Sequence, residues 1–403
     1  MRHRDFTSRL CLFALLAGAA VASGCATSDP DDDHDPGAGD DDDDDVPPGP
    51  DEPITGGEAN CGPLDTASCV PLASDYLPTN SAGDAYPACI SDGGVYQLVA
   101  DPPSSIARVE AFEMMGTLLW NEGTPGPGAF TQAREIYATP EGLQSRLERR
   151  EDLHYPPIPE PDWDPGFDPD KQCSVAANVQ KYPERCAGPS TINPLLTQAL
   201  LDGAAAVGDP RMQAARIEAA GQWFLYISAY KEAYTCTRKA KDCDSSWAYY
   251  TGGHQVGGAV IGFAKQVAEA SPLAHQRIFD GVLAVRCFRD LYDPEQYPTY
   301  DDLPADGKAM FDTAWEQLDQ ALHAGYAAML RSRMQRLSRC GDDSLTSVYW
   351  EFLRVAGPVL DREAKERDPV LAVELEAIWK LALPTLDDLA RAIDLLDAVF
   401  PCP

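Results

Sequence analysis

The sequence predicts an all-α protein, built as one or two up-and-down helical bundles behind a loop-rich, disulfide-bonded N-terminal cap. From residue 104 onward, apolar side chains recur at intervals of three and four, which is the period of amphipathic helices. Prolines stand at or just before the first turns of several of these segments, where a missing N–H is tolerated. No alternation of apolar and polar residues indicates a sheet, and neither a GxGxxG fingerprint nor a P-loop occurs.

Residues 1–25 have the pattern of an export signal. Three arginines precede an apolar run over 10–22, which is too short to span a bilayer comfortably. The run ends in Val21-Ala-Ser-Gly-Cys25, which resembles the lipobox of bacterial lipoproteins. That resemblance implies cleavage before Cys25 and lipidation of its thiol, so the expected partner is a membrane, held through an N-terminal lipid. Ala26 favours the outer membrane or cell surface, and an ordinary signal peptide cut nearby is the alternative.

Residues 26–53 are predicted to form a disordered tether. They hold twelve aspartates together with proline and glycine, a composition that cannot bury enough surface to offset chain entropy. The whole chain carries 64 acidic residues against 32 Lys and Arg, a formal net charge of −32. No Lys or Arg occurs between Arg9 and Arg108, and no basic stripe is present. Such a surface repels nucleic acid, so nucleic acid is excluded as a partner.

The cysteines agree with export. Ten remain when Cys11 of the signal and Cys25 are set aside, and an even number in an exported chain predicts disulfides. No CxxC pair occurs, so a thiolate zinc site has little support. Short spacing predicts three bonds, Cys61–Cys69, Cys173–Cys186 and Cys236–Cys243. Residues 54–103, rich in Gly, Pro, Ser and Asp, form the expected cap with at most one short hairpin.

Helices are expected throughout the region 104–403. Ser104 is the expected cap of the first, and Pro272, Pro369 and Pro384 mark later starts. The proline-rich segment 155–170 lacks a period and is a candidate surface loop, so a boundary between two bundles would lie near 155–190. The expected ranges are 104–121, 129–138, 140–153, 193–207, 211–236, 245–270, 273–291, 306–337, 344–366, 369–383 and 385–400.

The stretch 242–254 combines more functional groups than any other and lies between two predicted helices. Hard cations prefer carboxylate, phenolate and imidazole donors. The turn therefore predicts a metal site. Glu218 and Glu232 of the preceding helix lie about 21 Å apart along its axis, so only one of them can belong to this site. The candidates are Asp242, Asp244, Tyr250 and His254, joined by either Glu218 or Glu232.

Structural roles compete with each of these ligand assignments. Asp244 is also a natural helix N-cap, and the aromatic side chains around it would serve equally as core. His254 would equally be an ordinary hydrogen-bonded histidine. Gly252 and Gly253 would permit close approach of a neighbouring helix. No HExxH, HxxxH or GxSxG motif occurs, so we do not expect an enzyme.

The run Asp242-Cys-Asp-Ser-Ser-Trp-Ala-Tyr-Tyr-Thr-Gly252, with the helices on either side, resembles the low-iron-inducible periplasmic protein family. These are exported algal proteins linked to iron assimilation, with bacterial relatives, and the resemblance covers about 190–335. It implies a helical, iron-associated protein without a defined catalytic reaction. Two functions follow as hypotheses: a lipid-anchored protein that binds iron or a related cation and assists its acquisition, or a metal-free surface lipoprotein that acts as an interaction scaffold.

Overall fold

A computed structural model describes residues 71–78, 86–139, 142–144, 158–167, 169–183, 185–186, 191–236, 239–293, 295–298, 300–339 and 343–401. The chain divides into two compact units, 1–49 and 50–403, and every described residue belongs to the second. The described residues form α-helices and short 3-10 turns without a strand, which confirms the all-α fold. None of these helices is long and apolar enough to cross a membrane.

Several predicted features fall outside the described residues. They are the export signal with Cys25, the tether, the Cys61–Cys69 pair and most of the helix expected over 140–153. The segment 155–190, where the sequence suggests a boundary between bundles, lies inside the second unit.

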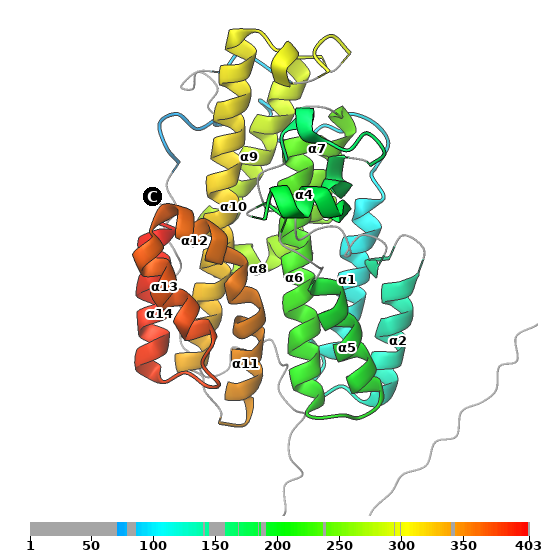
Figure 1. The fold of residues 1–403 in the computed structure, drawn as a ribbon, viewed down its shortest axis with the longest axis vertical. Coiled ribbons are helices and arrows are strands. Elements are labelled where there is room, and N and C mark those ends of the chain that lie inside the picture. The colour runs from blue at the N-terminus through cyan, green and yellow to red at the C-terminus, as the bar shows by residue number, and fades with distance from the viewer. Residues whose placement is uncertain are drawn as a thin grey trace, which may run out of the picture. The chain divides into compact units, whose positions relative to one another are not determined.

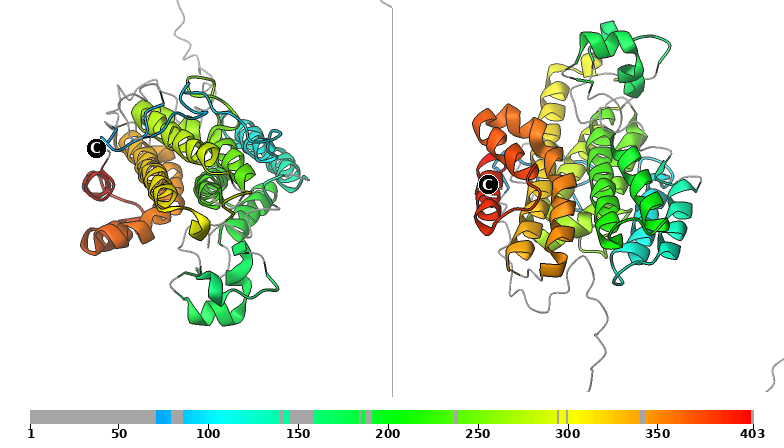
Figure 2. Two further views of the ribbon diagram at one scale, coloured as in Figure 1. Left: turned by 90° about the horizontal axis from the view of Figure 1, so that it is seen from above. Right: turned by 60° about the horizontal axis from the view of Figure 1, so that its bottom comes forward.

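Two long helices organise the second unit (Figures 1 and 2). Helix α6 packs against α5, α7 and α11, while α10 packs against α8, α9 and α14. Gly281 of α9 permits the close packing of α9 on α10, because a Cβ there would lie 2.8 Å from the Cα of Leu318. The bounds are α1 Ser105–Leu119, α2 Pro127–Ala138, α4 Ala176–Lys181, α5 Ile192–Ala204, α6 Pro210–Thr235, α7 Ala240–Thr251, α8 Gly262–Ala270, α9 Pro272–Leu291, α10 Ala305–Arg339, α11 Asp343–Ala356, α12 Asp361–Arg367, α13 Pro369–Trp379 and α14 Leu386–Val399.

Local sequence signals explain where several helices begin. The Asp209 carboxylate caps α6 by accepting from the Arg211 amide, with Pro210 in the first turn. Ser271 caps α9 in the same way. Thr385 and Asp388 form a reciprocal capping box at the start of α14. These starts need no tertiary contact, which is why the sequence predicts them within a residue or two.

The single helix predicted over 245–270 is two helices in the structure. Helix α7 begins at Ala240 and ends where Gly252 takes a left-handed conformation with φ 67°. Gly253 and Gly257 also have positive φ, at 88° and 77°, so the chain between α7 and α8 cannot be helical. Asp244 consequently lies inside a helix, and its predicted role as N-cap is wrong.

The helix predicted over 344–366 is also divided. Helix α11 ends at Ala356, a 3-10 turn spans Gly357–Leu360, and α12 follows. Pro358 lies in that turn, where it removes an amide from the helical ladder. The division turns α12 away from the line of α11. One further short helix, α4, was not predicted; it follows a 3-10 turn over Pro169–Ser174, and the bond Cys173–Cys186 spans it.

The described part of the cap, 71–78 and 86–103, is fastened to the helices at both of its ends. The disulfide Cys89–Cys287 joins it to α9, and Asp75 forms a buried ion pair with Arg277 of the same helix at 2.9 Å. Two glutamine side chains each exchange a pair of hydrogen bonds with a cap residue's backbone, Gln317 with Tyr76 and Gln255 with Tyr96. The cap therefore obtains its backbone partners from helices and loops, and its described part contains no hairpin.

Candidate functional site

Asp244, one of the predicted metal ligands of the turn, instead binds the cap through hydrogen bonds. Its carboxylate accepts hydrogen bonds from the Tyr96 hydroxyl at 2.9 Å, the Val99 amide at 3.0 Å and the Ala100 amide at 3.2 Å. Trp247, one helical turn further along α7, stacks on the Tyr96 ring with centroids 4.7 Å apart. Because its oxygens are occupied by three donors, Asp244 is a structural acceptor in this arrangement.

Asp242 and Glu232 are the two predicted ligands that the structure brings near each other. They lie on facing ends of α7 and α6, next to the disulfide Cys236–Cys243 that closes this helix pair. Burial, and to a smaller extent the negative charge of Glu232, raise the pKa of Asp242 from its ordinary value to about 6. Glu232 forms an ion pair with the neighbouring Lys231 at 3.4 Å. No His or third acid completes a metal group here among the described residues.

Replacing Asp242 with asparagine is expected to stabilise the protein at pH 7 by about 1–3 kcal/mol, since the variant removes a charge that burial disfavours. The folded-state pKa of about 6 lies above the ordinary 3.8, so the native state binds the proton more tightly. The free energy of unfolding that is lost by burying the ionised Asp242 carboxylate is therefore absent below pH 3.8, and this loss grows as pH rises to about 6. Urea unfolding at pH 4 and pH 7 measures this, and equal stability of variant and wild type at pH 7 contradicts it.

The remaining predicted ligands lie apart from that pair. The Tyr250 hydroxyl is 2.8 Å from Nδ1 of His275 and is fully buried, which raises its pKa well above the ordinary value. His254 is exposed on the loop between α7 and α8. Glu218 forms a buried ion pair with Arg333 of α10 at 2.5 Å. The structure thus does not gather Asp242, Asp244, Tyr250 and His254 around one point with either Glu218 or Glu232.

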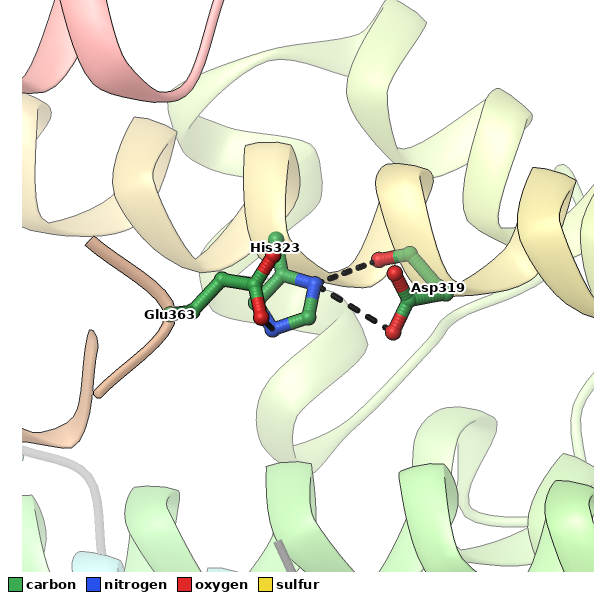
Figure 3. A group of neighbouring side chains, drawn as sticks. All are labelled: Asp319, His323 and Glu363. Atoms are coloured by element: carbon green, nitrogen blue, oxygen red, sulfur yellow. Dashed lines mark hydrogen bonds and ion pairs between the residues drawn. The ribbon is translucent and has the colours of Figure 1, made fainter. Parts of the chain in front are cut away.

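A different group of metal-ligand side chains is assembled by α10 and α12. Asp319 and His323 lie one turn apart on α10, and Glu363 reaches them from α12 (Figure 3). One donor atom from each lies within 4.8 Å of the others. Donors that share a first-row ion at about 2.1 Å each lie at most about 4.2 Å apart, so these three atoms are close to the spacing that one ion requires. We call these three residues the His323 site.

The histidine of this site has a defined tautomer. Its Nδ1 lies 2.8 Å from the backbone oxygen of Asp319, and a carbonyl can only accept, so Nδ1 carries the proton. The lone pair then belongs to Nε2, which lies 3.8 Å from a Glu363 carboxylate oxygen. Metal-binding histidines commonly donate their second N–H to a carbonyl or carboxylate in this way, which fixes the ring.

The two carboxylates are the accessible part of the site. The His323 side chain is 1% exposed, while those of Asp319 and Glu363 are 23% and 17% exposed. Phe400, just beyond α14, stacks against the imidazole with centroids 6.2 Å apart. Arg367 pairs with the other Glu363 oxygen at 2.8 Å and lies over the Phe400 ring. A cation would therefore enter from the carboxylate side and meet the imidazole last.

Tyr230 of α6 forms the inner wall of the site. Its hydroxyl donates a hydrogen bond to the Asp319 carboxylate, and its ring lies 5.8 Å from that of His323. Burial raises the pKa of Tyr230 well above its ordinary value, and the charge of Asp319 acts in the same direction. Burial by itself would raise the pKa of Asp319. Hydrogen bonds from His323 and Tyr230 outweigh this effect, so the pKa of Asp319 is lowered and the carboxylate stays ionised.

Sequence reasoning missed this site for an identifiable reason. The motifs HExxH and HxxxH pair a histidine with a second histidine, whereas His323 has only carboxylate neighbours in this group. The pattern that could have indicated it is Asp-x-x-x-His over 319–323, which places a carboxylate and an imidazole on one helix face. Glu363 follows only after a further helix, so its contribution depends on the tertiary fold.

Comparison with known proteins supplies no relative for this chain. No family model matches it, and neither a curated protein nor a solved structure matches it significantly. The class of protein defined so far is an all-α, disulfide-bonded helical assembly with a His and two carboxylates at one point.

Proposed function

We propose that this chain is an exported, lipid-anchored helical protein that binds iron or a related first-row cation at the His323 site and assists its acquisition. The observation that carries the proposal is the proximity of an imidazole and two carboxylates from two helices, with one donor atom of each within 4.8 Å of the others. One nitrogen and several carboxylate oxygens suit Fe, Mn or Zn better than Ca or Mg, which favour all-oxygen sites.

Features elsewhere in the chain support an acquisition role. The lipobox-like Cys25 and the aspartate-rich tether would place the folded unit outside the inner membrane, where scarce cations are captured. The net charge of −32 raises the local concentration of cations at the surface. The resemblance of 242–252 to low-iron-inducible periplasmic proteins points to iron in particular. Within this proposal the cation is cargo and the protein is not an enzyme.

The alternative is a metal-free surface lipoprotein that serves as an interaction scaffold. One observation favours it: the residues of the 242–254 turn act in packing and in holding the cap, as Asp244 and Trp247 do. The two functions differ in whether any cation is bound selectively, so one titration separates them.

Replacing His323 with glutamine is expected to weaken Fe(II) binding by at least about 100-fold, or ~2.7 kcal/mol, because the only nitrogen ligand is lost. Calorimetry and thermal shift of the full-length chain under argon, titrated separately with Fe(II), Zn(II) and Ca(II), measure this. His254→Gln is the matched control, because His254 is exposed and lies outside the site, and it should bind as wild type.

Two results would count against the His323 site. If His254→Gln loses binding and His323→Gln keeps it, the site lies at the 242–254 turn. If all three cations give the same weak response in every variant, the acidic surface alone attracts them and the scaffold function is favoured.

A further inference from the structure

Helix α13 is apolar on every side, although only its inner side is covered. Two of its eleven residues, Glu374 and Glu376, are charged, and all the others are apolar. The inner side is buried where the helix packs against α12 and α14. Because a helix that is apolar all round is normally covered on all sides, the outer side of α13 has the composition of a buried surface.

The outer side of α13 exposes Val370, Val373 and Ala377, whose spacing of three and four residues places them in one stripe. We call this stripe the α13 face. Val370 and Val373 are 69% and 63% exposed, and Leu386, at the start of α14, is 66% exposed. These three are the most exposed large apolar side chains among the described residues, and all of them belong to the hairpin of α13 and α14. Such a concentration differs from the single exposed apolar side chains that are common on any surface.

The acids that border the α13 face already have cations. Glu374, on one side of the stripe, pairs with Arg391 of α14 at 2.5 Å. Glu376, on the other side, pairs with Lys365 at 2.9 Å and with Lys380 at 2.6 Å. The whole chain has a formal net charge of −32, so two copies repel each other over most of their surface. That repulsion is reduced at the α13 face, because both acids of the helix are neutralised by bases of the same chain.

We propose that the α13 face binds a second copy of this chain, with the two α13 helices antiparallel about a two-fold axis near Ala377. The small alanine in the middle of the stripe lets the helices approach closely. In an antiparallel pair the valine-bearing end of one helix faces the end of the other, where the exposed Leu383 and Leu386 follow. A two-fold axis makes the same patch serve both copies, which is the commonest form of dimer. The proposal does not require a bound cation.

The charges at the border favour a second copy over other occupants. Glu376 and Lys380 lie on the same side of the stripe, and an antiparallel arrangement brings Glu376 of one copy near Lys380 of the other, twice by symmetry. The bordering charges are therefore complementary to themselves. A basic partner would instead need unpaired acids, and an anionic lipid surface would be repelled by the negative charge of the chain.

Val373→Glu is expected to weaken dimerisation by at least about 30-fold, because it places an unpaired charge in the centre of the contact. Sedimentation equilibrium of the full-length chain measures this from about 1 µM to about 100 µM, at the weak end of the range that protein interfaces cover. Val373 is exposed, so the variant should unfold at the wild-type temperature. That measurement separates loss of the dimer from loss of the fold.

Leu273→Glu is the matched control, because Leu273 is also an exposed apolar side chain on a helix but belongs to α9. It should dimerise as wild type. All variants carry the same N-terminal residues, so association through that segment would be equal in each.

Three results would overturn the proposal. The first is a wild-type chain that stays monomeric over the whole range, and the second is equal weakening by Val373→Glu and Leu273→Glu. The third is a monomeric wild type that binds phosphatidylcholine vesicles and loses this binding in Val373→Glu, which would assign the face to a lipid surface. Cation binding is measured separately, so failure of the proposed function leaves these outcomes unchanged.

Discussion

Replacing Arg333 with methionine is expected to lower the free energy of unfolding by about 3–5 kcal/mol at pH 7, the largest effect of any single change considered. Glu218 and Arg333 are almost fully buried and lie 2.5 Å apart, between α6 and α10. Arg333 also donates to Gln266 at 2.7 Å and lies over the Phe352 ring. Methionine keeps much of the packing volume but leaves the Glu218 carboxylate buried without its cation.

The stability that Arg333→Met loses relative to wild type should depend on pH. Burial raises the pKa of Glu218 even with Arg333 opposing it, so removing Arg333 raises that pKa further. A carboxyl whose folded pKa is raised costs stability as pH rises above its unfolded value. The difference between variant and wild type should therefore be smaller at pH 5 than at pH 8, as measured by urea unfolding.

Two further variants control the interpretation. Adding Glu218→Gln to Arg333→Met should recover much of the lost stability, because no charge is then buried unpaired. Arg331→Ala, on the same helix, removes a surface pair with Asp397 at 3.1 Å and should change stability by under about 1 kcal/mol. If Arg333→Met unfolds at the wild-type urea concentration, the pair contributes nothing and the buried-charge account is wrong.

Asp244→Ala is expected to cost about 2–4 kcal/mol and to release the cap from α7. The substitution leaves the Tyr96 hydroxyl and the amides of Val99 and Ala100 without their acceptor. Hydrogen exchange at those two amides should rise sharply, and proteolysis in the cap should speed up. Core helices such as α6 should keep their protection, because Cys89–Cys287 and the Asp75–Arg277 pair still hold the other end of the cap.

Asp244→Asn provides the matched comparison, since an amide keeps one acceptor oxygen and nearly the same volume. It should lose less stability than Asp244→Ala. Asp242→Asn, two residues away on the same helix, should act in the opposite direction. Unchanged exchange at Val99 and Ala100 in Asp244→Ala would show that this carboxylate does not hold the cap.

The helices were largely predictable because their signals are local. Apolar periodicity, the Asp209 cap and the Thr385–Asp388 box act within one or two turns, so the all-α fold follows from them directly. The bonds Cys173–Cys186 and Cys236–Cys243 join residues 13 and 7 positions apart, the spacing on which their prediction rested. The break after Gly252 was missed because a glycine's φ depends on how the chain must turn.

By itself, then, the sequence determined an acidic, all-α chain with local disulfides, since helix periodicity, caps and short loops are properties of neighbouring residues. Only the tertiary structure decided which functional groups meet. In the folded chain Cys89 is bonded to Cys287, 198 positions away, and Asp244 accepts hydrogen bonds from the cap. Glu363 likewise lies beside Asp319 and His323 only in the folded chain. The physical reason is that α10 and α12 are separated by α11 and a proline-containing turn, so the angle between them, and with it the site, is set by packing rather than by residue spacing.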